Sequence, residues 1–234
     1  MQKDSTLLNK MVKKTVVGLS GGMDSTTLLG FLLDQGHEVH CCIFTYGSKH
    51  NQYENKAAHD VVEFYKEKGF PVFAYDFNLE ATFAPFKSNL LKTGGEIPEG
   101  HYEDASMSLT VVPGRNMIFA AIMAGLAESI GAESVALGVH NGDHAIYPDC
   151  RAEFIKALDL AVYLGSDRKV EVLTPLVGEN KESILLLGSS CFVPYELTRT
   201  CYKDQPVSCG KCGSCQERLE AFKNLNKIDP IPYE

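Results

Sequence analysis

A pair of adjacent glycines near the start of the chain lies between a β-branched run and an apolar segment, and this junction constrains the fold most. Residues 15–19 are rich in valine and predict a buried strand. Residues 24–35, with leucines and a phenylalanine at helical spacing, predict a helix that ends at Gly36. Residues 38–44 predict a second strand. A strand, a helix and a strand in this order form a βαβ unit, whose strands are parallel.

The alternation of helices and strands continues to the end of the chain. Further helices are predicted over 52–68, 116–130, 151–164, 180–188 and 215–225, and further strands over 70–75, 134–139 and 170–173. The helix over 116–130 is rich in Ala and Met, so we expect it to be buried on most sides. Residues 80–112 interrupt the alternation with glycines and a proline, and we interpret them as an excursion beside the active site. The pattern predicts an α/β fold with a doubly wound, mainly parallel sheet.

Length and charge narrow the class of protein. The chain has 234 residues and a formal net charge of −8, so extensive binding to nucleic acid is not expected. It has no apolar run of about 18 residues and no secretory pattern at its start, so we expect a cytoplasmic protein without a membrane span. We expect an α/β domain over 14–195 with a small metal-binding tail over 196–225 packed on it.

The segment from Ser20 to Ser25 joins the first strand to the first helix, and its chemistry favours a phosphate site. Two glycines allow an anion to approach the backbone, successive N–H groups form an anion nest, and the helix presents its positive end. Asp24 is suited to hold Mg²⁺ between phosphate oxygens. The segment is neither a Walker A loop nor a dinucleotide fingerprint. The alternative is a tight turn in which Asp24 caps the helix.

Four cysteines lie close together near the end of the chain, at Cys201, Cys209, Cys212 and Cys215. Four thiolates can close a tetrahedral site, which is the arrangement of structural zinc. An iron–sulfur cluster is the rival interpretation, although the ferredoxin spacing is incomplete. A third alternative is that the thiols bind nothing. Without an export signal, a disulfide framework is not expected.

The segment Ser-Gly-Gly-Met-Asp-Ser resembles the pyrophosphate loop of the adenylating ATP pyrophosphatases. Further motifs narrow the choice: Tyr46-Gly47 with His50, Pro113-Gly-Arg-Asn116, Gly138 to Asp143, and Tyr147-Pro-Asp-Cys-Arg151. Together with the four cysteines, they resemble the 7-cyano-7-deazaguanine synthase family of queuosine biosynthesis over residues 14–223. The resemblance implies an ATP-dependent ligase that acts on 7-carboxy-7-deazaguanine and ammonia. It also implies an adenine nucleotide alpha hydrolase-like fold, Mg²⁺ and Zn²⁺ as metals, and a homodimer.

The resemblance and the chemistry of the side chains together nominate the site residues. Asp24, Arg115 and Lys181 are the catalytic candidates. Candidates for binding ATP are Leu19, Ser20, Gly21, Gly22, Met23, Asp24, Ser25, Thr26, Thr27, Leu28, Leu29, Tyr46 and Arg115. Candidates for binding the deazaguanine substrate are His50, His140, Asp143, Asp149 and Arg151.

Each nomination has a structural alternative. Arg115 can belong to a surface ion pair, Lys181 can be solvated at a helix start, and the histidines and Tyr46 can be packed in the core. Asp143, Asp149 and Arg151 can cap helices or pair within loops. Rival functions are a deazaguanine enzyme that stops at the amide or modifies DNA, tRNA or protein, a tRNA thiolation enzyme, and a nucleotide-binding module without catalysis.

Overall fold

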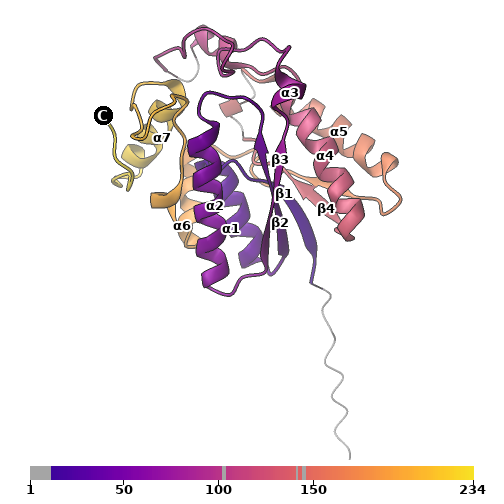
Figure 1. The fold of residues 1–234 in the computed structure, drawn as a ribbon. Helices are drawn as coiled ribbons and strands as arrows, with labels where there is room; N and C mark the ends of the chain where they lie inside the picture. Colours follow the sequence, from indigo (N-terminus) through magenta and orange to yellow (C-terminus); the bar gives the residue numbers. More distant parts are fainter. Residues whose placement is uncertain (1–11, 102–103, 141, 144–145) are drawn as a thin grey trace, which may run out of the picture.

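The computed structural model describes residues 12–101, 104–140, 142–143 and 146–234. Asn141 of the motif from Gly138 to Asp143, and residues 102 and 103 of the excursion, lie outside the described residues. Among the described residues, five parallel strands form one sheet in the order β3-β2-β1-β4-β5 (Figure 1). The strands are β1 (Lys14–Gly18), β2 (Glu38–Thr45), β3 (Val72–Asn78), β4 (Ser134–Ala136) and β5 (Glu171–Leu173). The expected parallel α/β fold is confirmed.

Helices cover both faces of the sheet, as a doubly wound fold requires (Figure 1). One face carries α1 (Met23–Asp34), α2 (Asn51–Glu67) and α6 (Lys181–Ser190). The other carries α4 (Arg115–Ile130) and α5 (Ala152–Gly165). Because side chains alternate along a strand, Val16 packs in the core beneath α4 and Val17 packs in the core beneath α1. The buried strands therefore supply two apolar cores.

Two sequence-based expectations need correction. The helix α4 is not buried on most sides: Ala120, Met123 and Ala127 form one buried stripe, and Met117 is 51% exposed. A parallel sheet with helices on both faces buries only one side of each helix. The fourth strand is also shorter than predicted and ends at Ala136, because the chain beyond it turns along the start of α1, where Gly138 lies against Ser25.

The excursion over 80–112 lies at the carboxyl end of the sheet, towards the top of Figure 1. It contains α3 (Glu80–Phe83) and a 3₁₀ turn, η1 (Ala105–Thr110). The Lys49 N–H donates to the Leu90 carbonyl at 2.8 Å, and Phe83 is buried. These contacts fasten the excursion to the segment that follows β2.

The tail runs through η4 (Tyr195–Leu197) to α7 (Gly213–Asn224), with Cys212 as the N-cap of α7. Phe222 of α7 shares an apolar cluster with Leu185 of α6 and Met23 of α1. Arg218 is fully buried and forms a two-bond ion pair with Asp229, through Nε at 2.7 Å and Nη2 at 2.9 Å. Across the described ranges, no helix has the length and apolar character needed to span a membrane.

Candidate active site

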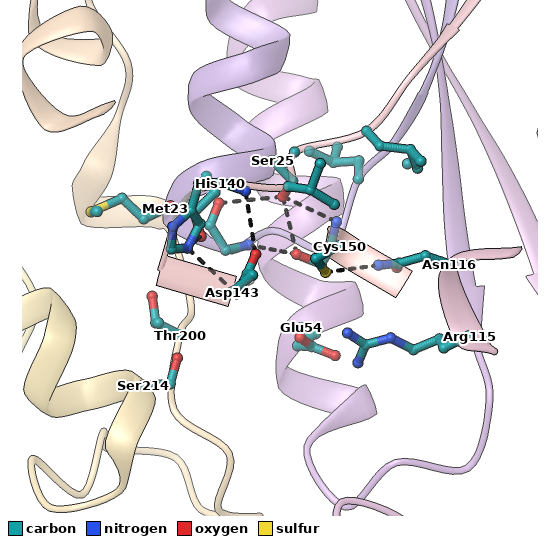
Figure 2. Close-up of a pocket in the computed structure, with 18 of the residues that line it drawn as sticks. Met23, Ser25, Glu54, Arg115, Asn116, His140, Asp143, Cys150, Thr200 and Ser214 are labelled. Atoms are coloured by element: carbon teal, nitrogen blue, oxygen red, sulfur yellow. Dashed lines mark hydrogen bonds and ion pairs between the residues drawn. The ribbon is translucent and has the colours of Figure 1, made fainter. Parts of the chain in front are cut away.

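A pocket of about 200 Å³ opens where β1, β2 and β4 end (Figure 2). At this point, the connections from neighbouring strands depart to opposite faces of the sheet, which is where open α/β sheets bind ligands. The pocket wall is built from the segment after β1, the start of α2, the start of α4, the segment after β4, and the tail. Parts of the chain that are far apart in sequence therefore meet at one site.

The segment from Ser20 to Ser25 forms one wall of the pocket, and internal hydrogen bonds fix its backbone. Ser20 N–H donates to Ser25 Oγ at 3.2 Å, and Gly22 N–H donates to Ser20 Oγ at 3.2 Å. Gly21 has a φ of +75°, and a Cβ there would lie 2.5 Å from the backbone nitrogen of Ala58. Only glycine satisfies both conditions.

The helix α1 begins at this segment, and its N-cap is Gly22 rather than Asp24. No described side chain caps the helix, and its first residues line the pocket, so its positive end lies at the pocket wall. The alternative in which Asp24 serves as the N-cap is therefore wrong. Asp24 belongs to the first turn and points its carboxylate into the pocket.

Lys181 lies at the centre of a charged cluster, although 157 residues separate it from Asp24. Its Nζ lies 2.9 Å from each carboxylate oxygen of Asp24 and 2.9 Å from His140 Nε2. The Glu217 Oε2 atom lies 3.0 Å from the same Nζ. Lys181 opens α6, and Asn180 fixes that helix start by accepting from Ser183 N–H at 2.8 Å. Lys181 is buried, so its alternative interpretation as a solvated lysine is wrong.

The charges in this cluster stabilise each other. Burial alone would raise the pKa of Asp24, but Lys181 and His140 outweigh it, so the pKa lies below its ordinary value. Burial alone would lower the pKa of Lys181, but Asp24 and Glu217 outweigh it, so that pKa is raised. Lysine and aspartate are consequently both charged at neutral pH, and the cluster presents an ammonium beside the anion site.

Glu217 was not anticipated from the sequence. It lies on α7, two residues after Cys215, and an isolated glutamate on a charged helix gives no signal of a buried site. Burial raises its pKa above the ordinary value despite the nearby Lys181. Its position shows that the tail contributes to the pocket. Other tail residues that line it are Arg199, Thr200, Tyr202 and Ser214.

Arg115 and Tyr46 lie together in another part of the pocket. The Arg115 Nη1–H donates to Tyr46 Oη at 3.2 Å. Burial alone would lower the pKa of Arg115, but the hydroxyls of Tyr46 and Tyr147 and the carboxylate of Asp149 raise it well above its ordinary value. Within the described part of the chain, Arg115 takes part in no ion pair, which contradicts its interpretation as a surface ion-pair residue.

His50, His140 and Asp143, nominated for substrate binding, line the same pocket. His50 Nε2 lies 3.1 Å from Glu54 Oε2, and His140 Nε2 lies 3.6 Å from Asp143 Oδ1. Both histidines are almost fully buried. Glu54 also lines the pocket but was not nominated from the sequence, because a glutamate in the first turn of a helix is common.

Seven nominated residues do not line the pocket, and one of them is Gly21 of the loop itself. The Asp149 carboxylate accepts the Asn116 N–H at 2.9 Å and so satisfies a free N–H at the start of α4, which agrees with its capping alternative. Arg151 is exposed at the start of α5. The remaining four face the core behind the loop, because they lie further along α1: Thr26, Thr27, Leu28 and Leu29.

The four cysteines of the tail form a compact, buried group. Their sulfur atoms all lie within 4.8 Å of one another. Backbone N–H groups point at two of them: Cys209 N–H donates to Cys201 Sγ at 3.4 Å, and Cys212 N–H donates to Cys209 Sγ at 3.3 Å. Such hydrogen bonds stabilise thiolates, which are the form that binds metal. The set can therefore hold one tetrahedral metal ion.

Arg199 connects the segment that carries the four cysteines to the loop Ser20–Ser25. Its backbone N–H donates to the Gly21 carbonyl at 2.7 Å. Its guanidinium donates to the carbonyls of Lys203, Gln205 and Pro206 at 2.7–3.1 Å. The segment that carries the four cysteines is thus fixed to the loop Ser20–Ser25, which faces the pocket.

Comparison with known proteins identifies the family. Residues 14–226 match the family described as "Queuosine biosynthesis protein QueC". The chain belongs to the QueC family. It is 44% identical over 221 residues to a QueC-type relative, the 7-cyano-7-deazaguanine synthase of Caldicellulosiruptor saccharolyticus, across 94% of this chain and 96% of that protein. It is 40% identical over 233 residues to the 7-cyano-7-deazaguanine synthase of Pseudoalteromonas atlantica, across 96% of this chain and all of that protein.

The chain also resembles solved structures in its fold. One is the NMN synthetase from Francisella tularensis, with a TM-score of 0.51 and 13% identity over 95% of this chain and 81% of that chain. At this identity the likeness concerns the fold alone. The family resemblance read from the sequence is confirmed.

Proposed function

We propose that this QueC protein is an ATP-dependent ligase that converts 7-carboxy-7-deazaguanine and ammonia to 7-cyano-7-deazaguanine. The observation that carries the proposal is the Lys181–Asp24 pair beside the loop Ser20–Ser25 in a chain of this family. An ammonium, a helix N-terminus and a glycine loop together suit a nucleoside triphosphate. The carboxylate of Asp24 would hold a Mg²⁺ ion, which would supply positive charge to the phosphates.

The first half of the reaction makes the acid reactive. A carboxylate oxygen of the substrate attacks the α-phosphorus of ATP, the bond to the bridging oxygen breaks, and pyrophosphate leaves. The Lys181 ammonium and the N–H groups of the loop stabilise the negative charge that develops on the pyrophosphate. Ammonia then attacks the carbonyl carbon, AMP leaves with its oxygen, and loss of one proton gives the amide.

The second half repeats the activation on the amide. The amide oxygen attacks the α-phosphorus of a second ATP, and pyrophosphate leaves again. AMP then departs with that oxygen while the nitrogen gives up two protons, which leaves the nitrile. The protein positions the reactants and stabilises charge, and no covalent bond to the enzyme is needed. His140 and Asp143 lie beside the loop, where they can accept protons.

The other polar residues of the pocket suit the deazaguanine and the nucleotide. Arg115 forms no ion pair in the described chain and has the planar fork that binds a carboxylate or a phosphate. Tyr46, which is held by Arg115, offers an aromatic edge to a base. His50 lines the same pocket and is proposed to contact the substrate.

We assign Zn²⁺ to the four cysteines. A tetrahedron with zinc–sulfur bonds of about 2.3 Å brings the sulfur atoms to about 3.8 Å from one another, and the group needs only a small contraction to reach this. The ion would close the segment 201–215 and hold the tail against the pocket. Reduced thiolates also support a cytoplasmic location. The division into 14–195 and 196–225 stays a prediction.

We further propose a homodimer, because α4 and α5 expose apolar side chains. Leu160 and Leu164, one helical turn apart on α5, are 58% and 66% exposed, and Met117 on α4 is exposed as well. Static light scattering is expected to give twice the chain mass for the wild type and one chain mass for Leu160→Glu/Leu164→Glu. A wild-type monomer would contradict this assignment.

The activity is tested by the mass of the product. Purified protein is supplied with 7-carboxy-7-deazaguanine, ATP, Mg²⁺ and ammonium, and the nitrile, AMP and pyrophosphate are expected. Lys181→Ala is expected to lower kcat at least 100-fold with its fold retained, whereas Lys223→Ala, an exposed lysine on α7, serves as the control. An amide as the final product, or turnover that requires tRNA, would contradict the proposal.

A further inference from the structure

Glu54 presents to the pocket a carboxylate oxygen that has no hydrogen-bond or ion-pair partner among the described residues. It lies in the first turn of α2, and its side chain is 17% exposed. One oxygen, Oε2, lies 3.1 Å from His50 Nε2. For the other oxygen, Oε1, the described residues provide no hydrogen bond or ion pair. Figure 2 shows the Glu54 side chain on the same side of the pocket as the Arg115 guanidinium.

His50 holds this carboxylate in place. The ring is 1% exposed and packs against Tyr202, with the ring centroids 5.5 Å apart. Its Nε2 faces Glu54, while its Nδ1 is buried without a hydrogen-bond partner. Packing against Tyr202 and the contact of Nε2 with Glu54 fix the ring, whereas Nδ1 contributes no hydrogen bond. The Glu54 carboxylate is therefore oriented before any ligand arrives.

The other acidic groups of the pocket are already engaged. Asp24 and Glu217 bind the Lys181 ammonium, and Asp143 faces His140. Asp149, nominated from the sequence to bind the base, accepts a backbone N–H of α4 instead. Among the described pocket residues, Glu54 is thus the carboxylate whose second oxygen is open to a ligand.

The chemistry around Glu54 suits one edge of a purine-like base. A carboxylate accepts two parallel hydrogen bonds from a ring N–H and an adjacent exocyclic amine. Arg115, which forms no ion pair with the residues that the structure describes, suits a carboxylate or a phosphate in the same pocket. Tyr46, Tyr202 and Phe119 line the space with aromatic rings. A flat base with N–H donors on one edge and an anionic substituent elsewhere matches this arrangement.

We propose that Glu54 binds the N1–H and 2-amino edge of the deazaguanine and so sets the specificity for a guanine-type base. This rests on the proposed function, since it assigns one contact within that reaction. Glu54 touches the substrate far from the bonds that change, so it determines binding rather than chemistry. His50 acts as a positioning residue through Glu54.

The test compares two substrates in matched variants. 7-Carboxy-7-deazaguanine and its analogue without the 2-amino group are assayed with wild type, Glu54→Gln, and Glu63→Gln, whose exposed glutamate on the same helix provides the control. The wild type is expected to prefer the amino substrate by about 100-fold in kcat/KM. Glu54→Gln places an amide, which also carries N–H donors, opposite the N1–H and 2-amino donors of the base. This variant is therefore expected to lose the preference through a higher KM for 7-carboxy-7-deazaguanine, while its KM for ATP stays unchanged.

The outcomes separate the two proposals. If the wild type does not turn over 7-carboxy-7-deazaguanine at all, the proposed function is wrong. If the wild type is active and Glu54→Gln keeps the wild-type preference for the amino substrate, the Glu54 assignment is wrong. If both substrates lose activity equally with a lower melting temperature, Glu54 has a structural role only and the assignment is also wrong.

Discussion

At the scale of single residues, the ion pair between Asp24 and Lys181 links the chemistry of the pocket to the stability of the fold. The pair joins the start of α1 to the start of α6 through two contacts of 2.9 Å. Replacing Asp24 leaves a buried ammonium with one fewer anionic partner. Buried charges that lose a partner destabilise the folded state strongly.

We expect Asp24→Asn to lower the free energy of unfolding by about 2 kcal/mol at pH 7, less than for a fully buried pair because Asp24 is 25% exposed. The pKa of Asp24 lies below its ordinary value in the folded state. Its contribution is therefore complete above the unfolded pKa of about 4 and is lost as the pH falls through the folded pKa.

Urea denaturation of both proteins across this pH range measures the effect. The gap between wild type and Asp24→Asn is expected to stay constant from pH 7 to pH 5 and to narrow below about pH 4. The change in metal affinity at low pH affects both proteins alike. A gap that widens with acid would contradict the assigned charge state.

At the scale of elements, the loop after β1 depends on its contact with α2. Gly21 has a positive φ, and its missing Cβ leaves room for the backbone of Ala58 and Glu54. Gly36 has a similar φ of +80°, but no atom lies within 4 Å of the position of its Cβ. Substitutions at the two glycines can therefore be compared. At Gly36 a side chain meets only the cost of the left-handed backbone, whereas at Gly21 it also meets a steric clash.

Gly36→Ala is expected to cost about 1 kcal/mol of unfolding free energy, from the left-handed backbone alone. Gly21→Ala adds a backbone clash and is expected to cost about 3 kcal/mol, with weaker binding of ATP. Thermal and urea unfolding of both variants measure this difference. Equal losses in the two variants would show that α2 does not confine the loop.

Most helices and strands could be predicted from the sequence. Contacts between distant segments determine where some of them end and which of their sides are exposed. The β1 strand, α1 and β2 follow from local patterns, because a buried parallel strand is a continuous apolar run. The early end of β4 and the exposed side of α4 follow from packing between distant segments, which periodicity does not encode. Asp24 and the four cysteines lie in sequence motifs, and Lys181 lies at a predicted helix start, so the sequence could nominate them. Glu54 and Glu217 become pocket residues only through tertiary contacts.

At the scale of the whole molecule, the tail is part of the pocket. It supplies Glu217 and Tyr202 to the wall, and the N-cap of α7 is one of the four cysteines. An isolated bridge also pairs Glu99 of the excursion with Cys212. Removing the metal is therefore expected to loosen the tail and the excursion without unfolding the sheet.

Hydrogen exchange before and after chelation tests this expectation. Amides over 199–216 and near Glu99 are expected to lose protection, those of β1 and β2 are expected to keep it, and added Zn²⁺ is expected to restore the pattern. The affinity for ATP is expected to fall with the lost protection, because Glu217 moves with α7. Unchanged exchange in the tail would contradict a structural metal.

The central claim is that ATP activates a carboxylate of the substrate at the loop Ser20–Ser25. The most direct test uses 7-carboxy-7-deazaguanine labelled with ¹⁸O in both carboxylate oxygens, followed by mass spectrometry of the products. The account predicts that both labels appear in AMP, one for each ATP consumed, and that none appears in pyrophosphate. Label in water or in phosphate, or ADP in place of AMP, would contradict it.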